Sequence, residues 1–261
     1  MPRGCRLPLR AYQTAAVNEA NIRNIICVLP TNSGKTIIAA ALTEQVVLSE
    51  NEAAGAAGKV IFLAPTRALA EQQAQVLLDQ IEILKSELDE EADSDDFRWR
   101  LRLIVGGRFG EGNTARSLRQ AQVAIMTPAK FEDALVHGHL QMQDVALLII
   151  DEAHHTRGNA HYATMMRYFY RTCDAVRRPR ILALTASPVE NAATKRPDVV
   201  TFEEDLKHLE CDLDAAAWSH DVPDDLCPHA LPQVLLHEPN LAPGAGMDSE
   251  LEAFVMDALR H

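Results

Sequence analysis

Six short, continuous runs of apolar residues divide this chain, and they restrict its fold more than any other feature. The runs are Ile25–Leu29, Val60–Ala64, Arg102–Val105, Val123–Met126, Ala146–Ile150 and Ile181–Thr185. Successive rather than alternate positions are apolar, which is typical of strands covered on both faces of a parallel sheet. Patterns with helical spacing lie between them, at Ala11–Ala20, Lys35–Leu48, Arg67–Lys85, Ala129–His137 and His161–Tyr170. The alternation predicts a doubly wound α/β domain whose ligand site lies at the carboxyl ends of the strands.

The pattern changes after residue 188, so we expect a domain over residues 1–189 and an acidic extension over residues 190–261. In the extension, Thr201–Glu204 has the spacing of a capping box and predicts the start of a helix. The apolar face of that helix would carry Leu206, Leu209 and Leu213. A second capping box predicts a helix over Ser249–Leu259. Its apolar stripe needs a surface to cover it, so we expect the extension to begin a further region.

The net charge of −12 is unevenly distributed along the chain. Residues 1–189 hold 21 basic and 21 acidic residues, whereas residues 190–261 hold 4 and 16. Seven of the acids in the first part lie in one segment, Glu87–Asp96. The remainder of that part is therefore mildly basic, and the overall charge does not exclude a nucleic-acid partner.

Several classes of protein are disfavoured by composition. No apolar run approaches the roughly 18 residues that a membrane-spanning helix needs, and the first residues lack the apolar segment of a secretory signal. The five cysteines are odd in number and scattered, which disfavours a disulfide framework. We therefore expect a protein without a membrane partner in a reducing compartment, the cytoplasm or the nucleus.

A phosphate-binding loop is predicted between the first apolar run and the helix that follows it. The loop has the sequence Pro30-Thr31-Asn32-Ser33-Gly34-Lys35-Thr36. Gly34 allows close approach of the backbone to a phosphate, and the helix start offers free N–H donors. Lys35 is placed to reach the β- and γ-phosphates of a nucleotide and Thr36 to bind Mg²⁺. The first glycine of the usual pattern is replaced by Leu29, while Asn32 tolerates the left-handed backbone that such loops use.

Two carboxylates stand at the end of the fifth apolar run. Asp151 directly follows Ile150 and is placed to bind Mg²⁺, and Glu152 is placed to deprotonate an attacking water. A phosphate loop followed by an acidic strand end predicts hydrolysis of a nucleoside triphosphate.

The motifs of the chain resemble those of superfamily 2 helicases. PTNSGKT, APTRALAEQQ, DEAHH and LTASP are similar to motifs I, Ia, II and III, in the same order. LRAYQ resembles the adenine-reading element of these proteins. HYATMMRYFY and RPRILALTASPV resemble the Dicer and RIG-I-like group, and the position of LRAYQ near Met1 favours a Dicer-like protein. The resemblance implies a RecA-like fold, ATP and Mg²⁺ as cofactors, and double-stranded RNA as partner.

The resemblance also implies a role for each matching residue. For the nucleotide it implies Arg10 and Gln13 at the adenine, Lys35 at the phosphates, and Thr36 with Asp151 at Mg²⁺. Glu152 would hold the nucleophilic water. The residues that would couple the nucleotide to the nucleic acid are His154, Thr185 and Ser187. Those that would contact the nucleic-acid backbone are Pro65, Thr66, Arg67, Thr127 and Pro128. Without the resemblance, Thr127-Pro128 indicates only a helix start with proline at its first position.

Two features of these helicases are missing from the motif series. No Q-x-x-G-R-x-R-like motif follows Pro188, and no RNase III-like segment is recognisable. We therefore expect a domain that needs a second RecA-like domain, in cis or in trans, and that by itself hydrolyses ATP near the background rate, because an arginine finger contributes ~10³–10⁵ in rate. Two alternatives remain open at this point: a catalytically idle module that binds RNA or a protein partner, and a helicase domain that acts on DNA.

Overall fold

A computed structural model describes residues 8–52, 58–81, 101–104, 114–187 and 199–220 of the chain. Within these residues, seven strands form one sheet in which every pair is parallel, in the order β3-β4-β2-β5-β6-β1-β7. The strands are β1 (Ile25–Val28), β2 (Lys59–Leu63), β3 (Leu101–Ile104), β4 (Val123–Met126), β5 (Val145–Ile150), β6 (Arg180–Thr185) and β7 (Ala216–Trp218). The predicted α/β class with a parallel sheet is confirmed.

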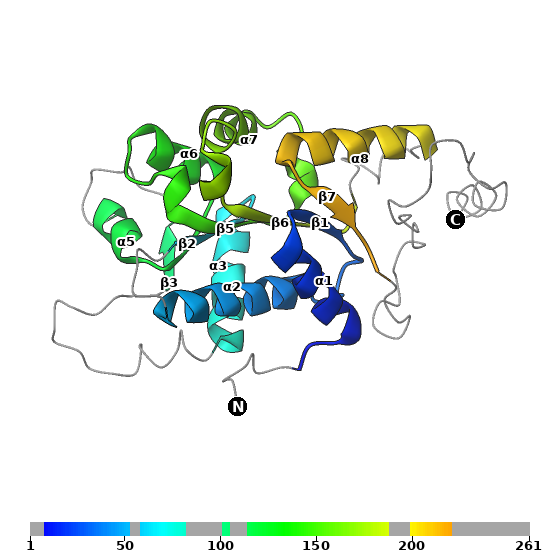
Figure 1. Cartoon of the computed structure of the whole chain (residues 1–261), viewed down its shortest axis with the longest axis horizontal. Helices are drawn as coiled ribbons and strands as arrows, with labels where there is room; N and C mark the ends of the chain where they lie inside the picture. Colours follow the sequence, from blue (N-terminus) through cyan, green and yellow to red (C-terminus); the bar gives the residue numbers. More distant parts are fainter. Residues whose placement is uncertain (1–7, 53–57, 82–100, 105–113, 188–198, 221–261) are drawn as a thin grey trace.

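Helices cover both faces of the sheet (Figure 1). One face carries α1 (Ala11–Ile22), α2 (Lys35–Glu52) and α3 (Arg67–Gln80). The other carries α5 (Thr114–Gln120), α6 (Pro128–Val136), α7 (Ala160–Thr164) and α8 (Val199–Leu213). Shorter helical segments are η1 (Met142–Asp144), η2 (Ala153–Thr156), the π-helix η3 (Met165–Tyr170) and η4 (Ala175–Arg177). None of the described helices is both long and apolar enough to cross a membrane.

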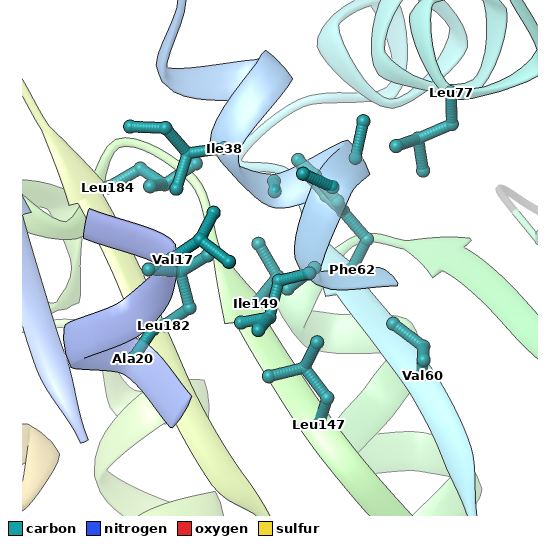
Figure 2. Close-up of a cluster of buried hydrophobic side chains, with 14 of the residues drawn as sticks. Val17, Ala20, Ile38, Val60, Phe62, Leu77, Leu147, Ile149, Leu182 and Leu184 are labelled. Atoms are coloured by element: carbon teal, nitrogen blue, oxygen red, sulfur yellow. The ribbon is translucent and has the colours of Figure 1, made fainter. Parts of the chain in front are cut away.

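Side chains from successive strand positions separate into two cores. Val60 and Phe62 pack with the helices of the first face, and Ile61 and Leu63 with those of the second. Figure 2 shows the first core, where Ile38 of α2 lies among the apolar side chains of the central strands. Each fully buried side chain of this size contributes roughly 1.5–3 kcal/mol, so the central strands are held from both sides. This explains why their sequences are continuously apolar.

The structure departs from the sequence prediction in several helices. The helical segment expected over His161–Tyr170 is present, but only α7 is α-helical, and its continuation η3 is a π-helix. The helix expected over Arg67–Lys85 ends earlier, at Gln80, where the N–H of Ile81 still donates to Leu77. Helix α5 was not predicted, since its seven residues contain a single large apolar side chain, Leu118, and show no periodicity.

Residues 199–220 form one helix, which packs on the sheet, and one strand, which joins it. Helix α8 begins at Val199, so the predicted start at Thr201 is wrong by two residues, although its apolar face is confirmed: Leu206, Leu209 and Leu213 are buried. Strand β7, which was not predicted, then pairs with β1. The division of the chain at residue 190 stays a prediction. The predicted helix over residues 249–259 and the acidic segment 87–96 lie outside the described residues.

Candidate active site at the carboxyl ends of the strands

The loop between β1 and α2 has the backbone that a phosphate loop requires. Asn32 and Gly34 both adopt left-handed conformations, with φ of 66° and 78°, as the sequence led us to expect for Asn32. The N–H of Ser33 donates to the carbonyl of Pro30 at 3.3 Å. The ammonium of Lys35 donates to the carbonyls of Leu29 and Pro30, each at 2.9 Å. The loop backbone therefore curves around the Lys35 side chain and binds its ammonium group.

The start of α1 holds this loop from the side. The hydroxyl of Tyr12 donates to the carbonyl of Ser33 at 2.6 Å, and Nε2 of Gln13 donates to the same oxygen at 3.2 Å. A Cβ atom at Gly34 would lie 2.7 Å from Nε2 of Gln13, so this position requires glycine for space as well as for backbone conformation. Arg10 also belongs to the group, because its guanidinium donates to the Tyr12 hydroxyl at 3.2 Å. The structure thus brings both predicted adenine-side residues to the loop.

Sequence reasoning missed Tyr12. Its position matches the apolar spacing of Ala16 and Val17 on the buried face of α1, so it is indistinguishable from a core residue in the sequence. Only the fold shows that its hydroxyl reaches the loop.

Asp151 lies at the carboxyl end of β5 and is 6% exposed. Its Oδ2 accepts a hydrogen bond from Nε2 of Gln73 at 2.8 Å, and its Oδ1 accepts one from the N–H of Glu152 at 3.1 Å. Burial, and secondarily the charge of Glu152, raise the pKa of Asp151 to about 6. The two hydrogen bonds and the charge of Lys35 oppose this rise. The carboxylate therefore lies in an environment that favours a cation beside it.

Gln73 is a second residue that the sequence analysis missed. It lies on α3 with the buried residues Ala70, Ala74 and Leu77, and is itself 7% exposed. The available signal was a polar amide at a position where the helical period predicts an apolar residue.

Glu152 and His154 lie in the short helical turn that directly follows β5 and Asp151. Glu152 has a left-handed backbone, with φ of 49° and ψ of 54°, which is uncommon for a non-glycine residue and occurs often at functional sites. Nδ1 of His154 lies 3.0 Å from Oγ1 of Thr185 at the end of β6 and 3.4 Å from a carboxylate oxygen of Glu152. The Thr185 hydroxyl donates to the carbonyl of Ser187 at 2.5 Å. The residues predicted to couple the two sides of the site therefore form one connected group.

The residues present fit a nucleotide with Mg²⁺. The Asp151 carboxylate and the Thr36 hydroxyl are oxygen ligands, which Mg²⁺ prefers. Thr36 is half-buried in the first turn of α2. In the loop, Oγ of Ser33 is fully buried and has no hydrogen-bond partner among the described residues, so it is a polar atom that the loop alone does not satisfy. Thr31 and Asn32 are exposed at the loop's tip.

The predicted nucleic-acid contacts lie together on two neighbouring strand ends. Strands β2 and β4 are adjacent, and the N–H of Ala64 donates to the carbonyl of Met126 at 3.0 Å where they end. Thr66 caps α3 by accepting from the N–H of Leu69, and Pro65 precedes it. Thr127 precedes α6, of which Pro128 is the first residue. Arg67 is exposed and pairs with Glu71 at 3.0 Å. The structure brings the two segments to one edge, next to Asp151.

An all-parallel sheet with a closed phosphate-type loop after β1 and a buried acidic strand end after β5 defines the class of P-loop α/β domains. Residues 10–194 match the model of the DEAD/DEAH box helicase family. The chain therefore belongs to that family, which implies ATPase and helicase activity and a requirement for ATP and Mg²⁺.

Known relatives narrow the position of the chain within the family. It is 34% identical over 216 residues to the Dicer-like protein 2 of Cryphonectria parasitica, covering 82% of this chain and 13% of the relative. It is 35% identical over 225 residues to the endoribonuclease Dicer homolog 3b of Oryza sativa subsp. japonica, covering 83% and 13%. The chain thus spans about an eighth of these relatives, where it corresponds to a helicase ATP-binding domain.

A solved structure supports the same fold. The helicase domain of Pyrococcus furiosus Hef is similar with a TM-score of 0.61 and 26% sequence identity, over 83% of this chain and 39% of that one. The predicted RecA-like helicase architecture is confirmed at this level.

Proposed function

We propose that this chain is the ATP-binding motor domain of a double-stranded-RNA-dependent helicase of Dicer-like type, which works with a second RecA-like domain. The main observation behind the proposal is that the carboxyl ends of three neighbouring strands, β5, β6 and β1, bring the predicted site residues to one edge of the sheet. Lys35 after β1, Asp151 after β5 and Thr185 of β6 belong to neighbouring segments of one sheet edge. Ligands of open parallel sheets bind at this edge.

The nucleotide would be held by the loop and the start of α1. The backbone N–H groups at the start of α2 and the ammonium of Lys35 bind the phosphates. To do so, the Lys35 ammonium must give up its hydrogen bonds to the carbonyls of Leu29 and Pro30. Gln13 and Arg10 bind the base. Thr36 and Asp151 hold Mg²⁺, which supplies charge neutralisation at the β- and γ-phosphates.

Glu152 would orient and deprotonate the attacking water, since its carboxylate lies next to the Mg²⁺ ligand Asp151. His154 then connects this carboxylate to the end of β6 through Thr185. A change in the position of Glu152 during hydrolysis is thereby passed to Ser187.

The RNA would lie across the ends of β2 and β4. Thr66 and Thr127 offer hydroxyl groups, and the starts of α3 and α6 offer backbone N–H groups and favourable dipoles. Contacts of this kind bind phosphates without reading sequence. The names of the curated relatives, which are Dicer-like proteins, support RNA rather than DNA as the partner.

The test is a binding and turnover assay on the purified chain with short double-stranded RNA, single-stranded RNA and double-stranded DNA. We expect binding of ATP and Mg²⁺, preference for double-stranded RNA, and turnover near background without a second RecA-like domain. Lys35→Ala should abolish nucleotide binding, whereas Glu152→Gln should retain it and lose residual turnover. Glu19→Gln, on the outer part of α1, is the matched control and should leave both unchanged.

Three results would contradict the proposal in different ways. RNA binding without any ATP binding would indicate an idle binding module. Preference for DNA would indicate a DNA-acting helicase domain. Rapid RNA-stimulated hydrolysis by the monomeric chain would refute the need for a second domain.

A further inference from the structure

Helix α3 touches both halves of the candidate site. Its first residue, Arg67, and its cap, Thr66, belong to the predicted nucleic-acid contacts. About two turns further along the same helix, Gln73 donates from Nε2 to Oδ2 of Asp151 at 2.8 Å. One helix therefore contacts the nucleic-acid side at its start and the Mg²⁺ side at its middle.

The side-chain amide of Gln73 is oriented by the hydrogen bond that it donates to Asp151. Gln73 is buried, and its Oε1 has no hydrogen-bond partner in the described structure. A buried amide with one unsatisfied atom is less favourable than a fully hydrogen-bonded one. Such a group is retained in a core at a cost, and the contact that it makes is with the carboxylate of Asp151. An amide whose role was only to fill space would be replaced without loss by an apolar side chain of the same length.

Asp151 is attached to the β2–α3 unit at two points. Its backbone N–H donates to the carbonyl of Leu63 at 2.9 Å, at the end of β2, and its side chain accepts from Gln73 on α3. The helix between these points is rigid, because Thr66 caps it and Ala70, Ala74 and Leu77 pack into the core. A displacement of the start of α3 must therefore change the position of Oδ2 of Asp151 or break its hydrogen bond.

We propose that Gln73 is a positioning residue that couples nucleic-acid binding at the start of α3 to Mg²⁺-nucleotide binding at Asp151. The inference rests on the proposed function, and it adds a specific route between the two ligands. RNA held at Thr66 and Arg67 fixes α3, and Gln73 then holds the Asp151 carboxylate in the orientation that receives the metal ion. By linkage, the nucleotide must change RNA affinity by the same factor as RNA changes nucleotide affinity.

The chain offers a matched control on the same helix. Nε2 of Gln75 also donates to an aspartate, Asp79, at 3.2 Å, but both residues of this pair are exposed and neither bonds to Asp151 in the hydrogen bonds described. Gln73→Met and Gln75→Met make the same chemical change, the loss of an amide donor with the side-chain length retained. Gln73→Leu is a second variant in case Gln73→Met does not fold.

The experiment measures the affinity of the purified chain for a fluorescent ATP analogue, with and without Mg²⁺ and with and without saturating short double-stranded RNA. In the wild type we expect RNA to tighten Mg²⁺-nucleotide binding by about fivefold or more. In Gln73→Met this factor should fall to about one, while Mg²⁺-free nucleotide binding, RNA binding without nucleotide and the thermal unfolding midpoint change little. Gln75→Met should keep the wild-type factor.

The outcomes separate the two proposals. If the wild type binds neither Mg²⁺-nucleotide nor RNA, the proposed function fails and the coupling role falls with it. If the wild type binds both and Gln73→Met or Gln73→Leu keeps the wild-type coupling factor, the role of Gln73 is refuted and the proposed function stands. A variant that loses all binding in proportion to its loss of thermal stability shows a structural role alone and also overturns the inference.

Discussion

Replacing Asp151 with asparagine is expected to stabilise the nucleotide-free and metal-free protein while abolishing Mg²⁺ binding. The carboxylate is 6% exposed, and burial raises its pKa from 3.8 to about 6. Its ionised form is therefore disfavoured in the folded state. Asparagine keeps the shape and removes the charge, and the amide of Gln73 can reverse so that its unsatisfied Oε1 accepts a hydrogen bond from the new side chain.

The magnitude follows from the pKa change on folding. A shift of one pKa unit corresponds to about 1.4 kcal/mol, so the shift to about 6 costs the wild type about 3 kcal/mol once Asp151 is ionised in both states. Because the folded-state pKa is raised, the folded protein binds the proton more tightly than the unfolded chain does. The cost is therefore present above pH 6 and is relieved as the pH falls towards 4.

The assay is urea unfolding of both proteins between pH 5 and 8 in the presence of a chelator. The variant should be more stable by up to about 3 kcal/mol at pH 8 and by about half of that at pH 5. Asp79→Asn is the control, since Asp79 also accepts from a glutamine amide but is exposed. A variant that is less stable than the wild type at pH 8, or a difference that does not change with pH, would refute the reasoning.

Three further predictions concern other parts of the site and its core. Gly34→Ala should weaken nucleotide binding by about tenfold or more in a titration, because Gly34 has a φ of 78° and the new Cβ would crowd Gln13 of α1. An unchanged affinity would show that this position does not require glycine. Tyr12→Phe should lower the free energy of unfolding by about 1 kcal/mol. Tyr162→Phe removes a buried hydroxyl that has no hydrogen-bond partner in the part of the chain that the structure describes, so it should leave the free energy of unfolding unchanged or raise it; equal losses in urea unfolding would rule this out. Burial raises the pKa of the Cys27 thiol to about 12, so Cys27 should resist alkylation by iodoacetamide at pH 8, while the exposed Cys211 should react. Mass spectrometry of the treated protein measures both, and modification of Cys27 in the folded protein would be the contrary result.

The central strands were predictable because their signals are local. A strand covered by helices on both faces must be apolar at every position, so the segments that became β1, β2, β4, β5 and β6 carry their assignment in their own composition. The loop at Gly34-Lys35-Thr36 and the carboxylates at Asp151-Glu152 were recognisable for a similar reason. Their chemistry requires particular residue types at fixed spacing, directly after a strand.

Elements that depend on partners distant in the sequence were not predictable in this way. Strand β7 has three residues, none of them fully buried, and it exists because β1 offers an open edge about 190 residues earlier in the chain. The π-helix η3 has the same apolar spacing as the α-helix that was predicted there. Met165, Met166 and Tyr170 of η3 are buried in the second core together with side chains of the sheet and α8, and these neighbours are not visible in the sequence.

The sequence by itself determined the class of fold, the phosphate-type loop and the acidic strand end, because each of these is a pattern of neighbouring residues under a local physical constraint. The tertiary structure alone decided that Tyr12 holds the loop and that Gln73 holds Asp151. Both lie at buried helical positions, where the periodicity of burial is visible in the sequence but the identity of the group across the interface is not. That identity depends on how the helices pack on the sheet, which brings Tyr12 of α1 to the loop and Gln73 of α3 to Asp151 at the end of β5.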